Sequence, residues 1–289
     1  MKATPSERLR SLFFYVIPHH GISWCVFQIA RIRWRPLKNL TIWIYTRLHA
    51  VNMKEAVIAD HYAYESLNAF FTRALKPESR PLDDPADSWI CPVDGTVSQA
   101  GLIDDGHIFQ AKGRYFSLTE LLAGDQTTAA RFRNGKFATL YLSPRDYHRI
   151  HMPSDAELKH MTYVPGRLFS VAPYTVKSIP RLFSRNERVI CEFDSRDGPF
   201  LMVLVGAINV SATETVWHGL VTSDHGKIMR FDYAAGEVSL QRGDEMGRFN
   251  LGSTVILITP QGFELDPEII ADQPVRMGRR FGQVMKSPH

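Results

Sequence analysis

The spacing of apolar residues divides this 289-residue chain into an N-terminal part with a helical pattern and a longer part with strand-like runs. In the N-terminal part, Leu40, Ile44, Leu48 and Val51 recur at the spacing of one helix face. The apolar stretches SLFFYVIP, ISWCVFQIA and LTIWIY are short, and none approaches the roughly 18–20 apolar residues that a membrane-spanning helix needs. We therefore predict short helices here, and no transmembrane span.

Residues 53–76, MKEAVIADHYAYESLNAFFTRALK, also predict a helix, which the Lys76-Pro77 pair would end. The stretch PESRPLDDPADS that follows is rich in proline and aspartate, a composition typical of a boundary. We therefore expect a helical, membrane-associating region over residues 1–76 and a second domain over residues 89–289.

From Trp89 onward the apolar runs have the length and composition of strands: ICPVDGTVSQAG, FATLYLSP, NERVICEFD, PFLMVLVGAINV and TVILITP. Asp197-Gly198 lies between two of these runs and indicates a hairpin. Within this part only residues 117–123, SLTELLA, clearly predict a helix. The chain is therefore expected to be α+β, with interfacial helices followed by a β-rich, mainly antiparallel sheet or barrel.

Charge and aromatic content set the first 52 residues apart. They carry eight basic residues against one acidic residue, a formal charge of +7, while the whole chain is +4 and residues 53–289 are therefore −3. Three of the five tryptophans also lie here. Basic residues beside apolar and aromatic ones suit an anionic membrane surface. A basic nucleic-acid-binding arm is the alternative, but such arms are seldom so rich in Ile, Leu, Phe and Trp.

Cysteine usage and the N-terminal pattern indicate a cellular location. Cys25, Cys91 and Cys191 are widely spaced and form no CxxC pair, which argues against a disulfide framework and favours core positions in a reducing compartment. The first apolar run is short, and no small-x-small cleavage site follows it, so a signal peptide is not predicted. We expect a peripheral protein on the cytoplasmic face of the cell membrane.

Two histidines stand out in YLSPRDYHRIHMP, where His148 and His151 are three residues apart after an apolar strand. A metal site is one interpretation, but HExxH is absent and no cysteine is near. Histidines without a catalytic role are another. A third is activation of a nucleophile, which needs a histidine as base and a carboxylate to orient it.

A carboxylate and a hydroxyl are available elsewhere in the sequence. Asp94 in CPVDGTV lies at a predicted tight turn, where an aspartate can simply shape the backbone. Ser253 precedes a strand in EMGRFNLGSTVI and is not part of a GxSxG nucleophile elbow. Spacing alone cannot join Asp94, His151 and Ser253 into one site.

Several blocks in this order resemble the bacterial, membrane-associated phosphatidylserine decarboxylases, and the similarity covers nearly the whole chain. The blocks are FFTRALKPESRP, PVDGTVSQAG, FQAKGRYFSLTELLAG, YLSPRDYHRIHMP, YVPGRLFSV, LFSRNERV, ETVWHG and EMGRFNLGSTVI. LGST is the self-cleavage signature of that family. The resemblance implies that Asp94, His151 and Ser253 form a charge-relay triad. Val93, where relatives often have Ala, is a small departure with no chemical consequence.

The resemblance also implies an unusual cofactor. Such enzymes cut themselves between glycine and serine, which here would split the Gly252–Ser253 bond and give chains 1–252 and 253–289. Ser253 would become a pyruvoyl group, so no metal and no pyridoxal phosphate are expected. A ketone can condense with the primary amine of phosphatidylserine and accept the electrons left when CO2 departs, which gives phosphatidylethanolamine. Gly252 suits the step because glycine adopts strained backbone angles and offers no side chain to block attack.

The remaining expectations concern substrate contacts and partners. His148 is our candidate for contact with the substrate carboxylate or for proton transfer, unless it only supports His151. The expected partners are phosphatidylserine in the bilayer, an anionic membrane surface and a second copy of the chain in a homodimer, with no nucleic acid. A membrane-bound serine hydrolase that uses the same three residues would retain Ser253 in an unbroken chain. A non-enzymatic lipid-binding scaffold would not need the three residues at all.

Overall fold

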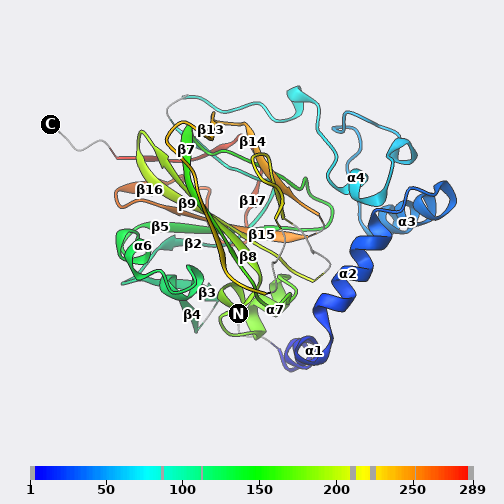
Figure 1. Cartoon of the computed structure of the whole chain (residues 1–289), viewed down its shortest axis with the longest axis horizontal. Coiled ribbons are helices and arrows are strands. Elements are labelled where there is room, and N and C mark those ends of the chain that lie inside the picture. The colour runs from blue at the N-terminus through cyan, green and yellow to red at the C-terminus, as the bar shows by residue number, and fades with distance from the viewer. Residues whose placement is uncertain are drawn as a thin grey trace.

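The computed structural model describes residues 4–85, 88–111, 113–208, 213–221, 226–250 and 252–285. Figure 1 shows two parts: helices that run along one side of the molecule, and a large twisted sheet that forms the rest. Three helices open the chain: α1 Pro5–Val16, α2 His19–Ala30 and α3 Arg35–Leu48. Among the described residues, none of the helices is both long and apolar enough to cross a membrane.

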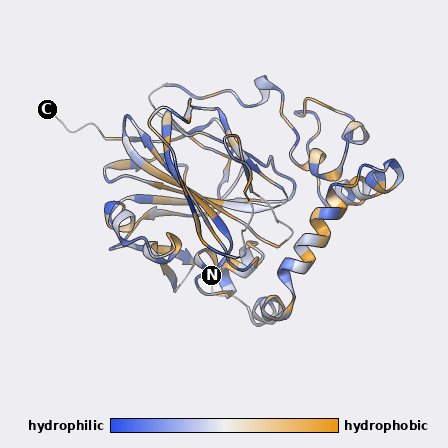
Figure 2. Ribbon diagram, viewed as in Figure 1, coloured by the Kyte–Doolittle hydropathy of each residue, from blue (hydrophilic) through white to orange (hydrophobic). Residues whose placement is uncertain are grey.

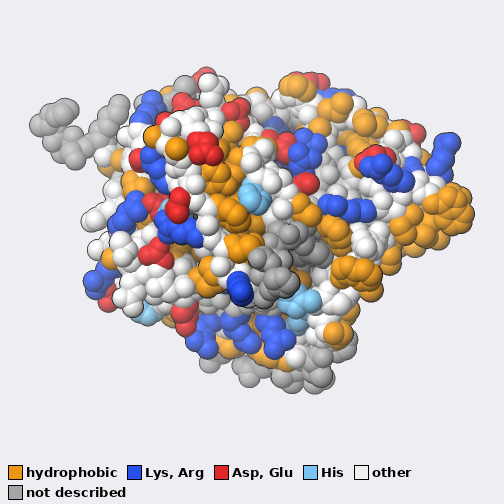
Figure 3. Space-filling model, in the orientation of Figure 1, with side chains coloured by type: hydrophobic (Ala, Val, Ile, Leu, Met, Phe, Trp, Pro, Cys, Tyr) orange, Lys and Arg blue, Asp and Glu red, His pale blue; other side chains and the backbone are white. Residues whose placement is uncertain are grey.

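The predicted short helices are confirmed, and their packing leaves much apolar surface uncovered. Pro36 near the start of α3 presets a helical backbone angle there. On this helix Ile42 is fully buried, whereas Leu48 keeps 72% of its surface exposed. Figures 2 and 3 show hydrophobic residues along α2 and α3 on this side of the molecule. The exposed large apolar residues of the two helices are Trp24, Ile29, Leu40, Trp43, Ile44 and Leu48, with Trp34 at their junction.

The prediction of one helix over residues 53–76 is wrong. The segment contains only the 3-10 turn η1 His61–Ala63 and the short helix α4 Leu67–Phe71. Asp60 and Ser66 each accept a hydrogen bond from a backbone N–H two or three residues later, so they begin short turns. Ala56 and Leu75 pair as an isolated antiparallel bridge, which folds the segment back on itself. Tertiary pairing therefore overrides the helix propensity of this stretch.

The main sheet confirms the predicted antiparallel, β-rich body. Its order is β12-β7-β8-β9-β15-β5-β2-β17, with β13 beside β7, and the pairs are antiparallel. β15, Ser253–Thr259, lies between β5 and β9 and is buried at every residue. The run TVILIT has the β-branched composition of a strand covered on both faces. The other bounds are β2 Gly95–Leu102, β5 Lys136–Leu142, β7 Ala156–Val164, β8 Arg188–Ser195, β9 Gly198–Val205, β12 Met229–Asp232, β13 Ser239–Leu240 and β17 Pro274–Val275.

Three smaller sheets accompany the main sheet. One has the order β11-β10-β14-β6, a second β1-β18-β16, and a third pairs β3 with β4. The expected hairpin at Asp197-Gly198 joins β8 to β9, with Ser195 opposite Gly198. The bounds are β1 Trp89–Ile90, β3 His107–Ala111, β4 Arg114–Ser117, β6 Arg149–His151, β10 Thr213–Thr215, β11 Gly219–Val221, β14 Glu245–Phe249, β16 Phe263–Leu265 and β18 Arg280–Val284.

The second part holds more helix than the sequence predicts. α5, Leu118–Leu121, lies within the predicted stretch 117–123, but α6 Gln126–Arg131, α7 Pro173–Ser178 and α8 Leu182–Arg185 were not anticipated. Each is too short to show a helical period. Asp125 caps α6 through the Thr128 N–H, and Pro173 begins α7.

The stretch between the two parts packs against the second part. It includes the turn η2 Pro77–Ser79, and the Asp83 N–H donates to the Gly278 carbonyl at 2.8 Å. Its residues 86–87 lie outside the described part of the chain. Two of the three cysteines, Cys91 and Cys191, occupy the core as expected, but Cys25 on α2 is exposed, so its predicted core position is wrong. Its helix face is not covered by the sheet.

Candidate active site

Ser253 is the first residue of β15, at the end of the most deeply buried strand. It is opposite Leu142 of β5, its exposed fraction is 0%, and its Oγ has no hydrogen-bond partner among the described residues. Buried hydroxyls normally have a partner, and the Ser253 hydroxyl shares this exception with those of Thr139, Ser143 and Thr254. Gly252, just before it, has φ +45°, in the left-handed region that favours glycine. An added Cβ there would meet no atom within 4 Å, so backbone angle, not crowding, selects glycine.

His148 lies in the loop that follows β5, and its ring is fully buried. Its Nδ1 is 3.0 Å from the Asp146 carbonyl oxygen, which only accepts, so Nδ1 carries the proton and Nε2 is the basic nitrogen. Nε2 has no partner among the described residues. Burial lowers the pKa of His148 to about 3, although the Asp146 and Leu142 backbones raise it. His148 is therefore neutral at pH 7 and lies beside Leu142, the residue that pairs with Ser253.

His151 ends β6 and has partners on both nitrogens. Nδ1 lies 2.7 Å from the Gly243 carbonyl oxygen and so carries the proton, and Nε2 accepts from the Tyr147 hydroxyl at 3.0 Å. Burial lowers the pKa of His151. The hydrogen bond to Gly243 and the Glu245 charge oppose that shift, and the Asp94 charge opposes it least. Burial likewise raises the pKa of Tyr147 to about 12, which keeps its hydroxyl protonated as the donor. The ring is thus a neutral base whose basic nitrogen is already occupied.

Asp94 is held by an arginine that the sequence analysis did not select. Arg80 donates from both Nε and Nη2 to the Asp94 carboxylate, and the Met277 N–H donates to Oδ1 at 2.9 Å. The side chains of Arg80 and Asp94 are only 9% and 12% exposed. Arg80 also donates to Glu55 at 2.9 Å. Such a two-point arginine contact orients a carboxylate closely.

A backbone hydrogen bond joins the segments that carry Asp94 and His151, whereas Ser253 Oγ makes no hydrogen bond to a described residue. The His151 N–H donates to the Pro92 carbonyl at 2.9 Å, which ties the His151 strand to the Asp94 turn. Yet in the described part of the chain no hydrogen bond joins Asp94 to His151, or either of them to Ser253. His148 is linked to the strand pair of Ser253 through the backbone of Leu142, which lies opposite Ser253.

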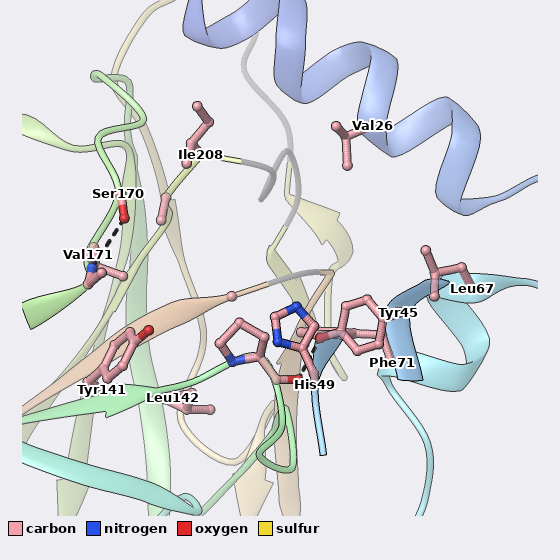
Figure 4. Close-up of a pocket in the computed structure, with 14 residues that line it drawn as sticks. Val26, Tyr45, His49, Leu67, Phe71, Tyr141, Leu142, Ser170, Val171 and Ile208 are labelled. Carbon is pink, nitrogen blue, oxygen red and sulfur yellow. Dashed lines mark hydrogen bonds between the residues drawn. The ribbon is translucent and has the colours of Figure 1, made fainter. Parts of the chain in front are cut away.

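Two separate pockets contain residues of this group. The first, which we call the apolar pocket, has a volume of about 330 Å³ and reaches Gly252. Figure 4 shows Tyr45, His49 and Phe71 on one side of it and Tyr141, Ser170 and Val171 on the other. Its remaining lining residues are Val26, Leu67, Leu142, Pro144, Ala172, Ala207 and Ile208. The helices and the sheet therefore share this pocket.

The second pocket, which we call the ionic pocket, has a volume of about 320 Å³ and contains Asp94. Tyr147, the partner of His151, also lines it. Its other charged lining residues are Glu55, Arg73, Arg80, Arg145, Asp146 and Arg276. Asp94 and Gly252 thus face different spaces.

Contacts from Tyr45 of α3, Phe71 of α4 and Arg73 hold the loop that carries His148, and we call these contacts the clamp. The Tyr45 hydroxyl of α3 donates to the Pro144 carbonyl at 2.5 Å, as the dashed line in Figure 4 marks. The Phe71 and His148 ring centroids are 4.0 Å apart. Arg73, itself buried, donates to the Arg145 and Asp146 carbonyls at 3.3 and 3.4 Å. The quoted block FFTRALKPESRP contained Phe71, Arg73 and Arg80, but no spacing rule assigned them a place.

The surroundings of Ser253 would accommodate a carbonyl group made from that residue. Ser253 Oγ is buried, unpaired and next to a left-handed glycine at the end of a pocket. Among the described residues, no cluster of His, Cys, Asp or Glu has a metal-binding arrangement.

Comparison with known proteins shows which family the chain resembles. A family model described as phosphatidylserine decarboxylase matches residues 67–283, and a second, described as PSD, matches residues 9–48. A phosphatidylserine decarboxylase proenzyme of Alkalilimnicola ehrlichii is 52% identical over 89% of this chain and 90% of its own. The proenzymes of Ectopseudomonas mendocina and Bordetella pertussis are 49% and 52% identical, over 96% and 91% of this chain and 98% and 90% of theirs.

Proposed function

Because the chain belongs to the phosphatidylserine decarboxylase family, we propose that it is a self-cleaving carboxy-lyase that uses a pyruvoyl group at position 253 to decarboxylate phosphatidylserine at a membrane surface. The activity itself, conversion of phosphatidylserine to phosphatidylethanolamine and CO2, follows from the family. One observation carries the rest: the left-handed Gly252 joined to the buried, unpaired Ser253 at the end of the apolar pocket.

Self-cleavage begins at the Gly252–Ser253 peptide bond. Ser253 Oγ attacks the Gly252 carbonyl carbon, the C–N bond breaks and a C–O ester bond forms, so the chain is joined through an ester. Elimination then breaks the ester and leaves Gly252 as a new carboxyl terminus. Addition of water and loss of ammonia convert residue 253 into the carbonyl group. Once formed, that carbonyl supplies the electron sink that decarboxylation of an amino acid requires.

His151 is the proposed base for this cleavage, and Asp94 its electrostatic partner. The ring is neutral, so Nε2 can take the Ser253 hydroxyl proton and return it to the leaving nitrogen. In the structure Tyr147 occupies that nitrogen. Cleavage therefore requires the Tyr147 hydrogen bond to break and the Gly252 turn to approach, a change typical of sites that tighten only during reaction.

His148 is the proposed group for the decarboxylation step. Its unprotonated Nε2 is buried and unpartnered beside the strand that carries Ser253. After CO2 departs, the α-carbon that carried the carboxyl group needs a proton. His148 Nε2 carries none in the structure, so it would first accept a proton from water and then pass it to that carbon. The clamp from Phe71 and Tyr45 keeps this ring in place.

The N-terminal helices supply the proposed contact with the membrane. Their exposed tryptophans and leucines would enter the interfacial layer, and each nearby Lys or Arg adds on the order of 1 kcal/mol on an anionic surface. Val26 of α2 and Tyr45 of α3 line the apolar pocket, so the substrate can reach Gly252 from beneath these helices with its acyl chains still in lipid. We assign the protein to the cytoplasmic face.

The intact mass of the purified protein tests the proposal. We expect two chains, 1–252 and 253–289, with the second beginning in a pyruvoyl group that cyanoborohydride and substrate amine tag. Ser253→Ala and His151→Ala should stay uncut and inactive. A fully active single chain that retains Ser253 would favour the serine hydrolase instead.

A further inference from the structure

The apolar pocket contains one side chain that can carry positive charge. Among its described lining residues, His49 is the only Lys, Arg or His. The substrate of the proposed reaction carries a negative phosphodiester next to its serine group. Arg73, a buried guanidinium of the ionic pocket, is directed to the Arg145 and Asp146 carbonyls instead. An anion in the apolar pocket therefore has a single cationic partner available from its lining.

Resting on the proposed function, we propose that His49 binds the phosphodiester of the substrate while the substrate amine reacts at position 253. His49 is thus a specificity-determining residue that selects phosphorylated serine lipids over uncharged ones.

The dimensions of the pocket allow both contacts at once. A cavity of about 330 Å³ is roughly 9 Å across if it is near spherical, and His49 and Gly252 both line it. In phosphatidylserine the amine and the phosphorus are separated by four bonds, on the order of 5 Å. Figure 4 shows the His49 ring within the group of residues that line this space. One molecule can therefore reach both ends.

The His49 ring is free to bind a ligand. It lies 4.6 Å from the Tyr45 ring, which fixes its position at the end of α3. The structure records no hydrogen bond from either ring nitrogen to a described residue, although the His49 backbone N–H donates to the Tyr45 carbonyl. Partial burial lowers the pKa of His49, which favours the neutral ring. A neutral ring still donates one N–H to a phosphate oxygen, and a bound anion favours its protonated form.

The first experiment measures binding without catalysis. Soluble dihexanoyl phosphatidylserine is titrated into three uncut proteins. They are Ser253→Ala alone, Ser253→Ala with His49→Gln, and Ser253→Ala with His49→Phe, in which Phe keeps the ring contact with Tyr45. We expect both substitutions to weaken binding about tenfold. For the methyl phosphotriester of the same lipid, which lacks the charge, all three proteins should bind alike. Equal binding of the charged lipid by all three would overturn the proposal, as would an equal loss for both lipids.

The second experiment uses the mature enzyme. His49→Gln should raise KM about tenfold and leave kcat within twofold, whereas His107→Gln, at an exposed position on β3, should change neither. Inorganic phosphate should compete with substrate in the wild type and lose that effect in His49→Gln if the ring recognises phosphate itself. If the intact lipid competes and inorganic phosphate does not, the His49 ring recognises the phosphodiester only as part of the lipid headgroup. A wild type that is uncut and inactive would refute the proposed function, and the binding experiment would still decide the role of His49.

Discussion

The apolar pocket and the ionic pocket are neighbours, yet they are built in opposite ways. Around Asp94, carboxylates are paired with arginines: Arg80 binds both Asp94 and Glu55, and Arg276 also binds Glu55, although Arg73 Nε is buried without a partner among the described residues. Around Ser253, polar atoms are buried without partners, namely Ser253 Oγ and His148 Nε2. Paired charges hold a geometry, while unpaired buried groups remain available for reaction. We infer that the residues of the ionic pocket hold the Asp94 carboxylate in position, and that the reaction takes place at the apolar pocket.

The largest expected effect is a difference between substitutions of the two histidines. His151 contacts Tyr147 of the ionic pocket, and His148 contacts Phe71 of the apolar pocket. His151→Ala should leave the chain uncut, because no base would activate Ser253. His148→Ala should still cut itself but decarboxylate at least about 100-fold more slowly, because a positioned group that accepts and passes on a proton is lost. Mass spectrometry and a decarboxylation assay on each variant give the answer. If His148→Ala stayed uncut and His151→Ala were cut, His148 would be the base for cleavage and His151 the group that acts in decarboxylation.

The next effect tests whether the ionic pocket depends on Arg80. Arg80→Met leaves the Asp94 carboxylate buried without its arginine, which should cost about 3–5 kcal/mol of unfolding free energy. Arg133→Met removes an exposed ion pair with Asp105 and should cost no more than about 1 kcal/mol. Urea denaturation of both variants measures the difference. If the two losses were equal, Arg80 would not hold Asp94 in the manner proposed.

A smaller effect concerns the pH dependence of stability at the buried His148. Its folded pKa of about 3 lies below the ordinary value of 6.5, so between these values the unfolded chain binds a proton that the folded chain does not. This group therefore destabilises the fold as pH falls from 6.5 toward 3, by about 1.4 kcal/mol per pH unit.

The matched pair for this measurement is Ser253→Ala with and without His148→Asn, so that both proteins are uncut. Urea denaturation between pH 4 and pH 6 should give a shallower pH slope when His148 is absent. Identical slopes would mean that the ring is protonated, and so exposed to water, in the folded protein.

The smallest effect tests the clamp between the helices and the reactive side. Tyr45→Phe removes only the hydrogen bond to the Pro144 carbonyl and should cost about 1 kcal/mol of stability. It should also lower kcat a few-fold without changing KM, because the loop that carries His148 loses one support. Tyr115→Phe, at an exposed position on β4, is the control. A shift in KM alone would instead place Tyr45 in contact with substrate.

Sequence patterns predicted the regular elements best where one signal acted alone. TVILITP predicted a strand, which the structure shows to be buried, and Asp197-Gly198 predicted the hairpin between β8 and β9. The helix predicted over residues 53–76 failed because the pairing of Ala56 with Leu75 outweighs local propensity. The short helices α6, α7 and α8 escaped prediction because four to six residues cannot display a helical period.

For the site, the sequence by itself determined which chemical groups are present: a Gly-Ser bond, two histidines three residues apart and an aspartate at a turn. Only the tertiary structure decided their neighbours. It paired Asp94 with Arg80, occupied His151 with Tyr147, set His148 beside the strand of Ser253 and brought His49 into the same pocket as Gly252. Spacing along a chain describes one helix or strand, whereas contacts between distant segments depend on how sheets and helices pack.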